Sequence, residues 1–146
     1  MAQVHILLVE DNEGDILLMN EALHKRPTVK KVSIAKNGQD AIDFVNKKKS
    51  FQTAETPDLI ILDINIPLKN GHEVLKALKG REDTKMIPII ILTTSSSPDD
   101  VNKCYAEFAN LFISKPENIM DLELAIDSLE NFWTGLIKLP TNSDYV

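Results

Sequence analysis

Five residues whose side chains suit phosphoryl chemistry each follow a short apolar run of the sequence directly or within two positions. They are Glu10, Asp11, Asp63, Thr93 and Lys115. Three carboxylates held together at neutral pH repel one another unless a cation lies among them or one keeps a proton. A hydroxyl and an ammonium group can bind phosphoryl oxygens, and a carboxylate can itself accept a phosphoryl group as an acyl phosphate. The set therefore predicts a site in which an aspartate receives a phosphoryl group beside a bound cation.

Magnesium is the cation that such ligands favour. Mg²⁺ prefers hard oxygen ligands, usually takes one or two carboxylates, keeps several waters and completes its shell with phosphate oxygens. We therefore expect Mg²⁺ as the cofactor of this site.

Strands must position these residues, because the preceding runs are short and aliphatic and alternate with amphipathic segments. This alternation is typical of βα units around a parallel sheet. Strands are expected at Val4–Val9, Val29–Ala35, Leu59–Leu62, 89–92 and 111–113, and helices near 15–24, 38–45, 70–78, 98–108 and from 119 onward. We predict a doubly wound, flavodoxin-like α/β fold in which five helices flank a five-stranded parallel sheet of order 2-1-3-4-5.

Ligands of such sheets bind outside the carboxyl ends of the strands, near the point where the strand order reverses. The predicted order puts the first and third strands side by side, so Asp11 and Asp63 should meet there. Each residue alone has an ordinary explanation as a cap, a turn residue or a solvated lysine, and the interpretation rests on their joint placement. The Lys115–Pro116 bond is a candidate cis peptide that would aim the lysine inward.

The motifs resemble those of the receiver domains of two-component response regulators over residues 4 to about 132. Their order and spacing match the family's. They are the acidic pair in ILLVEDN, the segment LDINIPLKNG with proline four and glycine eight residues after its aspartate, a threonine five residues after Pro88, and the pair Lys115-Pro116 with Phe112 three residues before the lysine. The chain is thus similar to a phosphorelay signalling protein.

The resemblance implies a role for each carboxylate. Asp63 would be the aspartate that a histidine kinase phosphorylates, forming an aspartyl phosphate. Asp11 and Asp63 would bind Mg²⁺ together with the main-chain carbonyl of Asn65, and Glu10 would act through a metal-bound water. The protein would be a switch and not an enzyme, apart from catalysing its own phosphotransfer and dephosphorylation.

The resemblance also implies a conformational switch. Lys115 and Thr93 would contact the phosphoryl oxygens, and Thr93 would move toward them on phosphorylation. Phe112 would then turn inward and remodel the face made by the fourth helix, the fifth strand and the fifth helix. Two positions differ from the commonest pattern: Thr94 replaces a smaller residue, and Phe112 replaces a tyrosine and lacks its hydroxyl.

The C-terminal segment is more apolar than a solvated tail. We predict a receiver domain at 1–134 and an extension at 135–146 without a separate output domain, so that output passes through protein contacts. One hypothesis is a homodimer through the fifth strand, the fifth helix and the extension, and the alternative is packing on the same domain. The dimer candidates are Phe132, Trp133, Leu136 and Ile137.

That tail is similar to the tails of the small single-domain regulators paired with bacterial and cyanobacterial phytochromes. The resemblance implies a homodimer, with a light-sensing histidine kinase such as a bacteriophytochrome as the phosphodonor.

Composition excludes several other classes. The chain has 146 residues and a net charge of −6, which suits one domain and opposes binding to nucleic acid. It contains no run of about 18–20 apolar residues and so predicts no membrane partner. The single cysteine, Cys104, fits a reducing compartment, and we expect a cytoplasmic protein.

Two alternative functions share parts of this pattern. A flavodoxin-like carrier of a flavin nucleotide would need a phosphate-binding loop after the first strand, where Glu10 and Asp11 would repel the phosphate. A phosphatase that forms an aspartyl phosphate would need a second acid two residues after its nucleophile, where this chain has Asn65.

Overall fold

Five parallel strands form one sheet in the order β2-β1-β3-β4-β5, which confirms the predicted topology. The structure is a computed structural model that describes residues 3–131, 133–134 and 139–140. The strands are β1 (Val4–Val9), β2 (Val29–Ala35), β3 (Leu59–Leu62), β4 (Ile89–Thr93) and β5 (Leu111–Ser114). β1 and β3 are neighbours although β2 lies between them in the sequence, so the strand order reverses at this pair.

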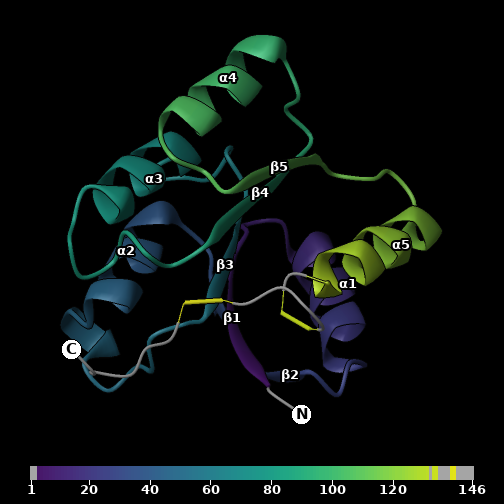
Figure 1. Cartoon of the computed structure of the whole chain (residues 1–146), viewed down its shortest axis with the longest axis horizontal. Coiled ribbons are helices and arrows are strands. Elements are labelled where there is room, and N and C mark those ends of the chain that lie inside the picture. The colour runs from purple at the N-terminus through teal and green to yellow at the C-terminus, as the bar shows by residue number, and fades with distance from the viewer. Residues whose placement is uncertain (1–2, 132, 135–138, 141–146) are drawn as a thin grey trace.

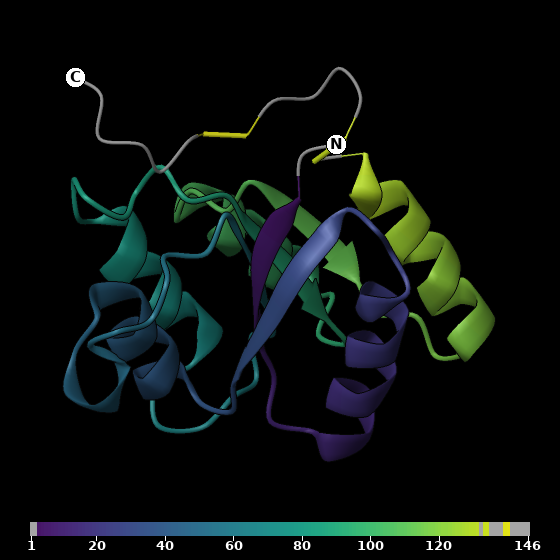
Figure 2. The same cartoon turned by 90° about the horizontal axis from the view of Figure 1, so that it is seen from below.

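Helices cover both faces of the sheet (Figure 1). They are α1 (Glu13–His24), α2 (Gly38–Asn46), α3 (Gly71–Lys79), α4 (Pro98–Ala106) and α5 (Ile119–Glu130), with a short 3₁₀ turn at Lys49–Phe51. α1 and α5 lie on one face, and α2, α3 and α4 lie on the other; the view from below separates the two layers in the same way (Figure 2).

Two hydrophobic cores result from this layering. Successive side chains of a strand point to opposite faces of the sheet, so the aliphatic runs supply both cores. Ile60 and Leu62 of β3 pack toward α2 and α3, whereas Leu59 and Ile61 pack toward α1 and α5. All four are essentially inaccessible to solvent, and burying each contributes about 1.5–3 kcal/mol. The rigidity of these central strands fixes the edge of the sheet where they end.

A polar residue caps the N-terminus of each α-helix, at the end of the loop that leads from the carboxyl edge of the sheet into the helix. A side-chain oxygen of the cap accepts a hydrogen bond from a backbone N–H in the first turn. The caps are Asn12, Asn37, Asn70, Ser97 and Asn118, and Asn70 also forms a reciprocal capping box with Glu73. These caps determine where the chain turns from strand to helix.

Trp133 anchors the end of α5 to the same domain. Its side chain is 5% exposed, and its indole N–H donates to Thr28 Oγ1 at 2.9 Å, while Thr28 donates to Glu130 at 2.6 Å. Arg26 adds ion pairs to Asp127 and Glu130. Packing on the same domain is therefore correct for Trp133, and its assignment to a dimer surface is wrong because the indole is already buried.

The other dimer candidates, Phe132, Leu136 and Ile137, lie outside the described residues. In the described part of the chain, the helices lack the combined length and apolar character needed to span a bilayer.

Candidate functional site

Four of the predicted site residues come together at the carboxyl edge of the sheet, where β1 and β3 lie side by side. Glu10 follows β1, Asp63 follows β3, Thr93 ends β4 and Lys115 follows β5. All four are buried or nearly so, and hydrogen bonds join them directly. The parallel sheet achieves this because its strands all end at the same edge.

Asp63 lies at the centre of this group. Thr93 Oγ1 donates to Asp63 Oδ1 at 2.7 Å, the main-chain N–H of Asn65 donates to the same oxygen at 3.3 Å, and Lys115 Nζ donates to Oδ2 at 3.2 Å. The residue is 9% exposed. Both carboxylate oxygens therefore already face groups that can bind the oxygens of a phosphoryl group.

Glu10 is a second, more deeply buried carboxylate. Oε2 accepts hydrogen bonds from the main-chain N–H groups of Asp11 and Asn12, and Oε1 accepts one from Lys115. Burial is the main cause that raises the pKa of Glu10 from 4.5 to about 7; the hydrogen bond from Lys115 opposes the rise, and the charge of Asp63 adds to it. Lys115 thus neutralises the charge of the carboxylates only in part. A further cation would reduce the remaining repulsion between Glu10 and Asp63.

Lys115 is the cation of the group, and three carboxylates surround it. Its Nζ contacts Glu10, lies 3.0 Å from Asp15 and 3.2 Å from Asp63, and its side chain is 10% exposed. Burial lowers the pKa of Lys115, but the hydrogen bond that it donates to Glu10, the charge of Asp63 and the hydrogen bond that it donates to Asp15 outweigh burial and raise the pKa overall. The ammonium group therefore stays charged.

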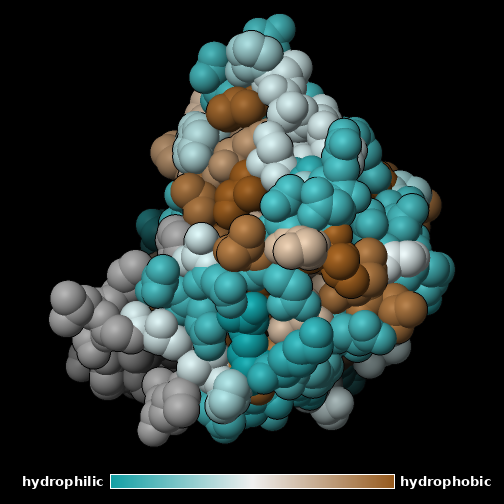
Figure 3. All heavy atoms as spheres, turned by 90° about the vertical axis from the view of Figure 1, so that its right-hand side faces the viewer, coloured by the Kyte–Doolittle hydropathy of each residue, from teal (hydrophilic) through white to brown (hydrophobic). Residues whose placement is uncertain are grey.

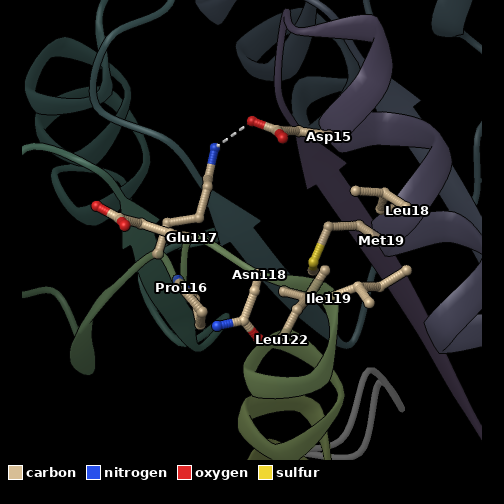
Figure 4. A pocket seen from close by; sticks show the side chains of 9 residues that line it. Asp15, Leu18, Met19, Pro116, Glu117, Asn118, Ile119 and Leu122 are labelled. Atoms are coloured by element: carbon tan, nitrogen blue, oxygen red, sulfur yellow. Dashed lines mark hydrogen bonds and ion pairs between the residues drawn. The ribbon is translucent and has the colours of Figure 1, made fainter.

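Asp15 is the site residue that sequence reasoning missed. It lies in the first turn of α1, four residues after Asp11 in the sequence, and its acidic side chain so close to the predicted carboxylates was the available signal. Its carboxylate accepts a hydrogen bond from Lys115 Nζ at 3.0 Å. Both residues line a small cavity of about 60 Å³ between α1 and the start of α5, and Figure 4 shows Asp15 on the α1 side of this cavity. The carboxylate holds the lysine between the acceptor and this cavity.

The predicted cis bond at Lys115–Pro116 is wrong, because every described peptide bond is trans. The main-chain N–H of Lys115 donates to Thr93 O at 2.7 Å, which extends the pairing of β4 with β5 by one residue. This bond positions the lysine, whose flexible side chain reaches the carboxylates without a cis junction.

Asp11 and Asn65, the other two predicted ligands, are both exposed. Within the described ranges, no three His, Cys, Asp or Glu side chains form a ready-made metal cluster. The donors nevertheless suit a hard cation, since they are the carboxylates of Asp11, Asp63 and Glu10 and a main-chain carbonyl. The ligand set stays a prediction.

Gly71 explains why glycine follows the aspartate after eight residues. Its N–H donates to Ile64 O at 2.8 Å, and an added Cβ would lie 2.7 Å from Ile64 Cα and 2.8 Å from Asp63 O. A side chain there would push the start of α3 away from the acceptor loop. The glycine thus lets α3 close the loop that holds Asp63.

Phe112 is half-buried on β5 and packs against the core on the side of α2, α3 and α4. Its main-chain N–H donates to the Tyr105 hydroxyl of α4 at 3.0 Å. Thr94, which follows the buried Thr93, is exposed. The predicted inward turn of Phe112 and the steric effect of Thr94 stay predictions.

Comparison with known proteins agrees with this geometry. The family model described as the response regulator receiver domain matches residues 6–127. The chain is 36% identical over 135 residues to Response regulator Rcp1 of Synechocystis sp., covering 92% of each chain. Its fold is similar to that of the phosphorylated cyanobacterial phytochrome response regulator RcpA, with a TM-score of 0.91, 36% identity and coverage of 96% of this chain and 100% of RcpA. The Mn²⁺-bound form of Rcp1 gives a TM-score of 0.88 at 36% identity, with 94% and 99% covered.

Proposed function

This chain belongs to the response regulator receiver domain family, and on that premise we propose that Asp63 accepts a phosphoryl group from a histidine kinase. The observation that carries the proposal is the pair of hydrogen bonds that Thr93 and Lys115 donate to the two oxygens of Asp63. Both donors suit phosphoryl oxygens, whereas the neighbouring Glu10 is buried more deeply, at 3% exposed against 9% for Asp63, and one of its oxygens is already bound to two main-chain N–H groups. The protein works as a switch whose state is the aspartyl phosphate.

The transfer needs a nucleophile, a charge partner and room for the new oxygens. An oxygen of Asp63 forms a bond to phosphorus while the P–N bond of the donor phosphohistidine breaks, and the histidine nitrogen keeps that electron pair. Lys115 is anchored by Glu10 and Asp15, so it can follow the added charge without leaving the site. The Thr93 hydroxyl exchanges its bond to Asp63 for one to a phosphoryl oxygen.

The proposed metal ligands are Asp11, Asp63, the carbonyl of Asn65 and, through water, Glu10. Mg²⁺ bound there would neutralise charge on the phosphoryl oxygens. The partly neutralised Glu10 supports this proposal, as does the existence of a Mn²⁺-bound Rcp1. Asn65 in place of an acid favours a long-lived switch over a phosphatase, because no second carboxylate stands two residues after the acceptor to activate water.

A small-molecule phosphodonor tests the acceptor. Incubation with acetyl phosphate and Mg²⁺ should add one acid-labile phosphoryl group, visible by intact-mass spectrometry, and Asp63→Asn should abolish it. Asp99→Asn, a change of the same type at an exposed position of α4, should leave labelling intact. Labelling retained in Asp63→Asn would overturn the assignment, and rapid turnover of phosphate esters would favour the phosphatase alternative.

The proposed phosphodonor in the cell is a phytochrome-type histidine kinase. RcpA is described as a cyanobacterial phytochrome response regulator, and a bacteriophytochrome response regulator, RtBRR, is 33% identical with a TM-score of 0.75. A phosphotransfer screen against purified histidine kinases tests this pairing. Faster transfer from a kinase without a phytochrome module would contradict it.

We also propose that β5 and α5 form a homodimer surface. β5 is an edge strand with half-buried side chains, and Ile119, Met120 and Leu124 of α5 are 53%, 75% and 61% exposed. Figure 3, which faces the side of Figure 1 where α5 lies, shows hydrophobic areas grouped among hydrophilic ones. Grouped exposed apolar side chains are typical of interfaces.

Sedimentation tests that surface. Leu124→Glu should shift the protein from dimer to monomer, whereas Leu68→Glu, a matched change at a side chain 75% exposed outside this surface, should leave the dimer intact. A monomeric wild type, or a dimeric Leu124→Glu variant, would contradict the proposal.

A further inference from the structure

A buried polar cluster joins α3 to α4 beside the acceptor site. His72 of α3 is 8% exposed and lies between two carboxylates of the neighbouring segment. Its Nδ1 is 2.5 Å from Glu107 Oε1, and its Nε2 is 3.5 Å from Asp100 Oδ1. The Cys104 Sγ lies 3.9 Å from Nδ1, and Lys76 Nζ lies 3.8 Å from Glu107 Oε2.

Glu107 shows that this cluster needs a positive charge. Its side chain is 8% exposed, and its buried Oε2 has no hydrogen-bond partner in the described part of the chain. A buried carboxylate requires a close cation, and the described neighbours that can supply one are His72 and the more distant, exposed Lys76. Cys104 adds no charge, because burial, followed by the charges of Glu107 and Asp100, raises its pKa to about 11.

A chain of hydrogen bonds continues from this cluster to the acceptor. Asp100 Oδ2 accepts a hydrogen bond from Ser95 Oγ, and the Ser95 N–H donates to Thr93 Oγ1 at 3.3 Å. Thr93 in turn donates to Asp63 at 2.7 Å. The hydrogen bond from Ser95 is the main cause that lowers the pKa of Asp100, and His72 contributes a smaller part. Asp100 therefore contacts both His72 and the loop that carries Thr93.

We propose that His72 is a positioning residue for Thr93, acting through Asp100 and Ser95. The imidazolium form carries N–H groups on both ring nitrogens and can bind Glu107 and Asp100 together, whereas a neutral imidazole can donate to only one of them. The charged form fixes the start of α4 and keeps Ser95 bonded to Thr93. Loss of the proton loosens Asp100 and lets Thr93 leave Asp63 more readily.

This inference rests on the proposed function for its consequence, but the coupling itself is measurable without phosphorylation. Histidine side chains ordinarily change charge between about pH 5 and 8. An NMR titration of the metal-free protein would follow the His72 ring and the Ser95 amide in a Glu10→Gln background, which removes the carboxyl whose pKa lies at about 7. We expect the Ser95 amide to shift with the midpoint of the His72 ring.

Two variants separate coupling from folding. In Asp100→Asn the His72 ring should still titrate while the Ser95 amide stops following it; in His72→Gln the Ser95 transition should disappear while the fold is kept. A Ser95 amide that follows the ring unchanged in Asp100→Asn, or never follows it, would overturn the proposal whatever the result of the acceptor test.

The kinetic consequence is measured separately. The rate of Asp63 phosphorylation by acetyl phosphate should be about twofold to fivefold higher in His72→Gln than in wild type at pH 6, the size expected for one partly exposed ion pair. His24→Gln, at an exposed position in the last turn of α1, is the matched control. Equal rates at pH 6 would contradict the positioning role.

Discussion

Two clusters of similar composition lie on either side of Thr93. In one, the Lys115 ammonium is surrounded by Glu10, Asp15 and Asp63; in the other, the His72 imidazole lies between Asp100 and Glu107. The first cation keeps its charge at any ordinary pH, whereas an imidazole can lose it. The comparison indicates that the lysine cluster supplies constant charge to the chemistry and that the histidine cluster can adjust the same hydroxyl.

The largest expected effect comes from removing the constant charge. Lys115→Ala leaves Glu10 and Asp63 facing each other without a cation, and breaking a buried ion pair costs about 3 kcal/mol. We expect that loss of unfolding free energy in EDTA, measured by urea denaturation, and phosphorylation slower by about 100-fold. Lys85→Ala, an exposed lysine, is the control. Unchanged stability in EDTA would contradict the role given to the lysine cluster, because Lys115 would then not neutralise the charge of Glu10 and Asp63.

The pH dependence of the metal-free protein gives the next effect. The pKa of Glu10 is about 7 in the folded state against 4.5 when free, so folding favours its protonated form. That contribution to stability is fully present below about pH 4.5 and is lost as the pH rises through 7. Glu10→Gln should therefore be more stable than wild type at pH 8 in EDTA by about 3 kcal/mol.

That difference should vanish near pH 4.5, and added Mg²⁺ should reduce it at pH 8 by stabilising the ionised carboxylate of the wild type. Urea denaturation at both pH values gives the measurement. A stability difference independent of pH would show that burial does not raise the pKa of Glu10. Lys115 alone would then be sufficient to neutralise the carboxylates around it.

The smallest effect is expected at Asp15. Its side chain is 37% exposed, and Lys115 keeps Glu10 and Asp63 when Asp15 is neutralised. Asp15→Asn should therefore cost about 0.5 kcal/mol in EDTA, well below the loss in Lys115→Ala, when both are measured by the same denaturation. A loss of unfolding free energy as large as that of Lys115→Ala would mean that Lys115 is stabilised mainly by Asp15 of α1 and not by the acceptor Asp63.

The sequence predicted the lysine cluster well and the histidine cluster not at all. Aliphatic runs mark the central strands, and parallel strands bring the residues that follow them to one edge of the sheet. The sequence alone therefore predicts that Glu10, Asp63, Thr93 and Lys115 lie together. His72 meets its partners across a helix-to-helix contact. Such a contact depends on how α3 and α4 lie on the sheet, and spacing along the chain does not specify this.

Trp133 shows a second limit of sequence patterns. An apolar residue at helical spacing near a chain end looks the same whether it packs on its own domain or against a partner. The structure distinguishes these cases through Thr28, the residue before β2, which accepts the hydrogen bond of the indole N–H. Likewise, a proline after Lys115 suggested a cis bond, although hydrogen bonding to Thr93 is sufficient to direct the lysine.

Chemical location of the phosphoryl group tests most directly whether Asp63 is the acceptor. Borohydride reduces an acyl phosphate of aspartate to homoserine, which peptide mass spectrometry can assign to a position. After incubation with acetyl phosphate and Mg²⁺, we expect this conversion at Asp63 and its absence when the donor is omitted. Conversion at Asp11, Asp15 or Glu10 in its place, or no conversion at Asp63, would contradict the assignment of Asp63 as the acceptor.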